Sequence, residues 1–121
     1  MGFEFGALVL VALGGAAGAM TRHAVGLAVD GRRSLLAVNV LGSLLLGITL
    51  AAPVGSRAAL ALGTGFCGAF TTFSSFAVET VVAAEHGDRR DAVLFALVTL
   101  LGAVAGVVLG SAIGGTVGTL V

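Results

Sequence analysis

Four long apolar runs, separated by short polar stretches, divide the sequence. Polar residues gather at 30–34 and 85–91, and Pro53, which cannot donate a hydrogen bond to a continuing helix, ends the second run. Apolar residues occupy all sides of each run, and the runs exceed the roughly 10 residues of a membrane β-strand. The pattern predicts one domain, residues 1–121, with four transmembrane helices at about 5–29, 35–52, 58–84 and 92–118.

The composition supports a membrane protein. Charged residues make up 10% of the chain, whereas a water-soluble domain usually carries about 25%. Four spans of roughly 20 residues need about 80 residues, which leaves little for a second domain. We therefore expect an all-α, multi-pass protein of the cell membrane. Six Arg balance six acidic residues, so we expect no basic patch and no nucleic-acid partner.

Small residues recur at helical spacing in the last run. Five glycines follow one another at intervals of four residues, namely Gly102, Gly106, Gly110, Gly114 and Gly118. Lipid tails give helices no hydrophobic reason to associate, so close packing in a membrane relies on small residues that let backbones approach. The repeat predicts a tightly packed helix–helix seam.

The third run contains an unusual polar cluster. Residues 70–76, Phe-Thr-Thr-Phe-Ser-Ser-Phe, place four hydroxyl groups and three rings together at mid-membrane depth, after several glycines. Glycine and β-branched threonine weaken a helix, so we expect a break between Gly68 and Thr72. Carbonyl groups freed there need partners, and a small cation is one way to satisfy them.

The same cluster offers groups that can hold an anion. Phe73 and Phe76 lie three residues apart on one helix face, and Thr72, Ser75 and Glu79 follow a neighbouring face. Aromatic rings have positive edges, so ring edges and hydroxyl donors could coordinate a small anion without a fixed cation. The alternative for any one residue is structural: hydroxyl groups bond back to their own helix, and rings fill the bundle.

Three further polar residues lie within or at the ends of the spans. Asn39 must bond something in the membrane, either a neighbouring helix or a transported ion. Arg22 ends the first span, where we expect a structural role in reaching the interface or capping carbonyl groups. Glu79 is either a proton or cation site or a side chain that reaches water, because it lies near the polar connector.

Three segments together resemble the Fluc/CrcB family of small membrane fluoride channels. They are GGAAGAMTRH at 14–23, LLAVNVLGSLLLG at 35–47 and GTGFCGAFTTFSSF at 63–76, and the resemblance in order and spacing covers essentially the whole chain. The family implies passive, fluoride-selective export that lowers cytoplasmic fluoride, with no enzyme chemistry. It also implies an antiparallel, dual-topology dimer with two anion pores and a central structural sodium ion.

The resemblance assigns roles to individual residues. Phe73 and Phe76 would be the ring pair facing fluoride, Asn39 a pore donor, and Thr72 and Ser75 part of a hydroxyl track. The backbone carbonyls of Gly68 and Thr71 would be offered to sodium. In the fourth span Thr99 is the one clear hydroxyl along 95–103, and His23 stands where the family usually has an aromatic residue.

Two alternatives concern function and pairing. A small proton-coupled multidrug exporter also has four spans, but it needs a carboxylate within span one, and the interior of this span has none. Arginines favour the connectors after spans one and three, with Arg32, Arg33, Arg89 and Arg90 there against Arg57 opposite. This bias predicts one orientation for the chain, and hence pairing with an oppositely oriented homologous subunit; pairing with an oppositely oriented copy of itself stays open.

Overall fold

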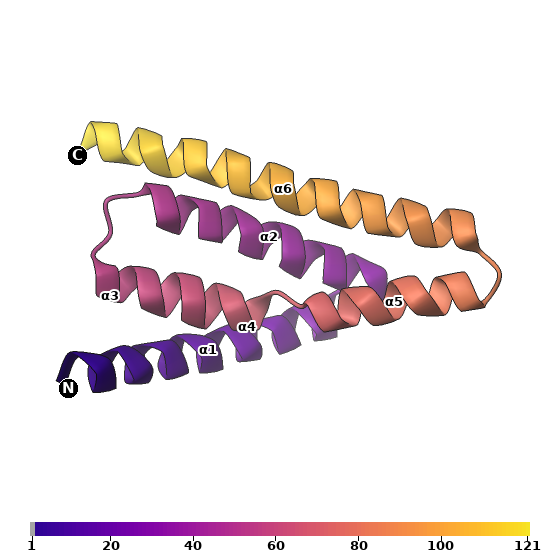
Figure 1. Ribbon diagram of the computed structural model, residues 1–121, viewed down its shortest axis with the longest axis horizontal. Coiled ribbons are helices and arrows are strands. Elements are labelled where there is room, and N and C mark those ends of the chain that lie inside the picture. Colours follow the sequence, from indigo (N-terminus) through magenta and orange to yellow (C-terminus); the bar gives the residue numbers. More distant parts are fainter. Residues whose placement is uncertain (1) are drawn as a thin grey trace.

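The computed structural model describes residues 2–121, which form four long helical segments running back and forth along one axis (Figure 1). The helices are α1 (Gly2–Ala28), α2 (Arg32–Ala51), α3 (Ser56–Ala59), η1 (Leu60–Cys67), α4 (Gly68–Phe70), α5 (Phe73–Glu85) and α6 (Arg89–Leu120). The start of α1, the connector after α2 and the end of α6 lie toward one end of the molecule (Figure 1). The connectors after α1 and α5 lie toward the other end, which we call the connector end.

The distribution of apolar side chains suits a lipid environment. Four segments, α1, α2, α3 to α5, and α6, are long and apolar enough to cross a membrane, and residues 2–121 contain no strand. Large apolar side chains cover the outside, and Leu8, Leu101 and Val108 are each more than half exposed. The expected all-α protein with four membrane-spanning helices is therefore confirmed.

The glycine repeat of α6 packs against α2. A Cβ atom added at Gly106 would lie 2.9 Å from the carbonyl oxygen of Val40. At Gly110 and Gly114 it would collide with carbonyl groups one and two turns further along α2. The two backbones thus lie in direct contact, which accounts for glycine at every fourth position.

A second close contact joins α1 to η1. Gly14 and Gly18 of α1 face the backbone of η1, where Ala61 and Phe66 leave no room for a Cβ atom. Gly65 of η1 lies equally close to α1, since a Cβ atom added there would lie 2.8 Å from the carbonyl oxygen of Val11. Glycines on both helices therefore allow η1, in the first half of the third segment, to pack closely against α1.

The third segment departs from a regular α-helix twice. Leu60–Cys67 is π-helical, a wider turn that the apolar pattern does not distinguish from an α-helix. After α4 the backbone becomes extended at Thr71 (ψ 161°) and Thr72 (φ −147°, ψ 111°), and α5 begins at Phe73. The expected break between Gly68 and Thr72 thus lies at the last two residues of that range.

Candidate functional site

Asn39 of α2 holds the broken helix. Its Oδ1 accepts a hydrogen bond from the amide of Thr72 at 2.8 Å, and its Nδ2 donates to the carbonyl oxygen of Thr72 at 3.2 Å. An unbroken helix would direct the Thr72 amide to the carbonyl of Gly68. The Asn39 amide therefore supplies the partners that the extended backbone lacks, and it keeps one further N–H for another acceptor.

Thr72 begins α5 and organises the nearby hydroxyl groups. Its Oγ1 accepts from the amide of Ser75 at 3.2 Å, the usual bond of a helix N-cap. The same oxygen donates to Ser75 Oγ at 3.1 Å and lies 3.3 Å from Ser74 Oγ. The three hydroxyl groups form one connected cluster at the start of α5.

A hollow of about 250 Å³ lies between α2, the helix break and α6. We call it the central groove. Its lining is uncharged and combines amide, hydroxyl, aromatic and small apolar groups, contributed by Asn39, Gly42, Ser43, Leu46, Thr71, Thr72, Phe73, Phe76, Thr99, Leu100 and Ala103. The structure therefore brings five of the six pore residues expected from the sequence into one hollow; the sixth, Ser75, faces a neighbouring one.

A row of rings runs along the groove toward the connector end. The centroids of Phe73 and Phe76 are 5.8 Å apart, and those of Phe76 and Phe95 are also 5.8 Å apart. Phe73 is 79% exposed on the single chain. A large ring at a helix start that finds no cover in its own chain is available to a partner surface.

Thr99 carries an unpartnered hydroxyl group. The residue is 4% exposed, and its Oγ1 has no hydrogen-bond partner within residues 2–121. Thr49, Thr80 and Thr116 instead donate to the carbonyl four residues earlier. Leaving a buried hydroxyl unpaired costs roughly 1–3 kcal/mol, and Thr99 lines the central groove, where its hydroxyl is available as a donor.

The two carbonyl groups expected to face sodium lie beside the break. The Thr72 amide bonds to Asn39, so Gly68 loses the donor that a continuous helix would give it. The Thr71 carbonyl oxygen accepts a hydrogen bond from Nη1 of Arg22 at 3.5 Å. Carbonyl oxygen atoms released from a helix are ligands of the kind that a small cation takes, and the Thr71 carbonyl is contacted by the positively charged Arg22.

Glu79 and Arg32 lie at the connector end. Nε of Arg32, at the start of α2, is 3.4 Å from Oε2 of Glu79 on α5. Nη1 of Arg32 contacts Oδ2 of Asp91 on α6. Sequence reasoning placed Arg32 only in a connector. It put Ser43 on the same helix face as Asn39 and Ala103 on that of Thr99, but it did not count either as a pore residue; both line the central groove.

Comparison with known proteins identifies the family. The model of the CrcB-like protein, Camphor Resistance (CrcB) family matches residues 9–111. A relative from Natronomonas pharaonis, named fluoride-specific ion channel FluC 2, is 56% identical over 86% of this chain and 90% of its own length. Haloarcula marismortui has two relatives. Its fluoride-specific ion channel FluC 2 is 45% identical over 81% of this chain and 85% of its own length. Its fluoride-specific ion channel FluC 1 is 46% identical over 64% of this chain and 65% of its own length. The chain therefore belongs to the CrcB family.

Proposed function

We propose that this protein is a passive fluoride channel. The observation that carries the proposal is the central groove, where the amide of Asn39, the hydroxyl of Thr99 and the rings of Phe73 and Phe76 meet without a charged residue. The names of the relatives, fluoride-specific ion channels, agree with this chemistry. The protein would let fluoride leave the cell down its gradient and thereby lower cytoplasmic fluoride.

The groove suits a small, strongly hydrated anion. Donors such as the free N–H of Asn39 and the Thr99 hydroxyl replace water molecules around the ion, and ring edges add weak positive potential. A fixed cation would hold the ion too firmly, whereas several weak sites allow it to leave. Chloride is larger and gains less from such compact contacts, which favours fluoride.

The hydroxyl cluster extends the path toward the connector end. Thr72 lines the central groove, and its Oγ1 donates to Ser75, which lines a second hollow together with Ser74 and Glu79. Two hollows joined by hydrogen-bonded hydroxyl groups offer a moving anion successive donors. Thr72 and Ser75 therefore act as the link between the groove and the outside.

A second subunit is part of the proposal. The exposed ring of Phe73 and the wide apolar surface leave the groove incomplete on one side of the single chain. An oppositely oriented partner would cover that side. The arginine bias favours a homologous subunit over an identical copy, and Haloarcula marismortui provides an organism with two relatives of this chain.

Sodium is proposed as the structural ion between the two subunits. The Gly68 and Thr71 carbonyls would hold it, with the same two groups from the partner, and the ion would supply positive charge to carbonyl oxygens freed by the break. Within this chain, the bond from the Thr72 amide to Asn39 takes that donor away from the Gly68 carbonyl, and the Thr71 carbonyl accepts from Arg22. Dimer stability would then depend on sodium, which size-exclusion chromatography in sodium and in N-methylglucamine would measure.

Ion flux from liposomes tests the function. Vesicles containing the protein should release fluoride far faster than chloride, and they should not accumulate a lipophilic cation such as tetraphenylphosphonium under a proton gradient. Equal release of fluoride and chloride would contradict the channel, and proton-driven uptake of the cation would instead support a multidrug exporter.

A further inference from the structure

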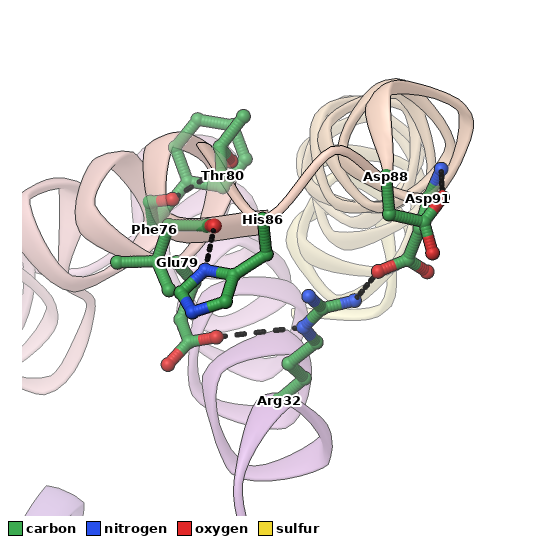
Figure 2. A network of polar contacts seen from close by, with 8 residues as sticks. Arg32, Phe76, Glu79, Thr80, His86, Asp88 and Asp91 are labelled. Atoms are coloured by element: carbon green, nitrogen blue, oxygen red, sulfur yellow. Dashed lines mark hydrogen bonds and ion pairs between the residues drawn. The ribbon is translucent and has the colours of Figure 1, made fainter. Parts of the chain in front are cut away.

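Arg32 joins three helices at the connector end. From the first residue of α2 its guanidinium group reaches Glu79 on α5 and Asp91 on α6, so that it lies between two carboxylates (Figure 2). Asp91 is itself held, because its backbone amide donates a hydrogen bond to Oδ1 of Asp88, the N-cap of α6, at 3.0 Å. The guanidinium group also lies over the ring of Phe95, 5.1 Å from its centroid.

Glu79 borders the hollow into which the hydroxyl cluster leads. This hollow has a volume of about 400 Å³ and is lined by Gly31, Leu35, Ser74, Ser75, Val78 and Glu79. We call it the mouth. Ser75 connects it to Thr72 and the central groove through a hydrogen bond of 3.1 Å. An anion that leaves the groove along these hydroxyl groups must therefore pass a carboxylate.

A bare carboxylate at this point would oppose anion movement. Like charges a few ångströms apart repel strongly at a protein surface next to the membrane, where water screens them only partly. Arg32 is the cation in contact with Glu79, and Phe95 keeps it next to the ring row, since the Phe95 ring lies 5.8 Å from that of Phe76. The ion pair therefore offsets part of the negative charge that Glu79 would otherwise present at the mouth, and Arg32 shares its charge with Asp91.

We propose that Arg32 is a positioning residue for fluoride conduction, which neutralises Glu79 at the mouth and so lets an anion pass. Asp91 assists by holding the other edge of the guanidinium group. Nothing in the central groove needs this cation, since the groove is uncharged. The inference rests on the proposed fluoride conduction, and it assigns the charge balance at the mouth to one arginine.

Paired substitutions separate this role from a structural one. Arg32→Ala leaves Glu79 uncompensated, and we expect fluoride efflux from liposomes to fall about tenfold. Adding Glu79→Gln removes the carboxylate, so the double variant should return to within about twofold of the unaltered protein. Arg33→Ala is the matched control: it removes a neighbouring arginine that forms no ion pair in residues 2–121 and should leave efflux unchanged.

The outcomes are distinguishable. If the unaltered protein passes no fluoride, the proposed function fails; if it conducts and Arg32→Ala conducts equally well, the role of Arg32 is refuted. A double variant that stays as slow as Arg32→Ala also refutes it, because that result indicates loss of helix packing. Should Arg32→Ala not fold, Glu79→Gln alone decides: it removes the carboxylate from the mouth while Arg32 stays paired with Asp91, and it should keep or raise fluoride efflux, whereas a fall contradicts the proposal.

Discussion

Asn39 on α2 and Thr72 in the helix break form a two-point hydrogen-bonded pair, in which a side-chain amide satisfies both the N–H and the C=O of one backbone residue. The pair crosses from one helix to another and is buried. It fixes where α5 begins, and therefore where Phe73 and Phe76 stand relative to α6. A single amide thus connects the backbone of the break to the geometry of the groove.

Replacing Asn39 by alanine should reduce both stability and conduction. Two buried backbone groups of Thr72 would lose their partners, at a cost of roughly 1–3 kcal/mol each. The expected result is a lower melting temperature in detergent together with slower fluoride efflux. Ser43→Ala is a suitable control, because Ser43 lines the same groove but holds no part of the break. An Asn39→Ala protein of unchanged melting temperature would show that the pair contributes little to the fold.

Removing the rings should affect conduction more than the fold of the single chain. Phe73 is 79% exposed, so Phe73→Ala takes away little packing within its own chain, and we expect slower fluoride efflux at nearly unchanged melting temperature. Phe76→Ala should slow efflux as well. Phe5, 72% exposed on α1 and outside the groove, provides the control for loss of an exposed ring. Normal conduction by Phe73→Ala, combined with dissociation of the proposed dimer, would assign the ring to subunit contact alone.

Thr99→Val tests the unpartnered hydroxyl group. Valine keeps the shape and removes a buried polar atom that has no partner, so stability should stay equal or rise by about 1 kcal/mol. Fluoride efflux should nevertheless fall, because a donor leaves the groove. Thr49 is the matched control. It is 3% exposed, and its hydroxyl donates to the Leu45 carbonyl at 2.8 Å. Thr49→Val should therefore leave fluoride efflux from liposomes unaltered.

The glycine seam predicts opposite results for two glycines of α6. A Cβ atom at Gly110 collides with the backbone of α2, so Gly110→Ala should separate the helices and cost about 1–3 kcal/mol or more. Gly115 has nothing within 4 Å of an added Cβ atom, and Gly115→Ala should be neutral or stabilising by up to about 1 kcal/mol. Thermal unfolding in detergent measures both. Equal behaviour of the two variants would place the α2–α6 contact elsewhere.

The sequence predicted the helices and the helix break, but it did not predict which residues contact one another between helices. Apolar length predicted the four spans, and glycines followed within a few residues by β-branched threonines predicted a break between Gly68 and Thr72, because both are local properties. The exact place of the break depends on Asn39, which lies 33 residues away in the chain. The ion pairs of Arg32 join residues 47 and 59 positions apart, and no local pattern carries that information. The close contact of η1 with α1, through Gly14, Gly18 and Gly65, likewise joins residues far apart in the chain.

The arginines predict one orientation of the chain in the membrane, which engineered thiols can measure. Arg32, Arg33, Arg89 and Arg90 flank the connector end, and loops rich in arginine stay cytoplasmic. Asp30→Cys at that end and Val54→Cys at the other leave the arginine count unchanged, and the native Cys67 is buried.

In cells, an impermeant maleimide should label Val54→Cys from outside and Asp30→Cys only after the membrane is opened. For the proposed antiparallel dimer, that result would call for a partner of opposite orientation from another chain, because copies in one orientation cannot form an antiparallel pair. Comparable labelling of both thiols from outside would instead mean that the chain inserts both ways, and the pair would then be two copies of this protein.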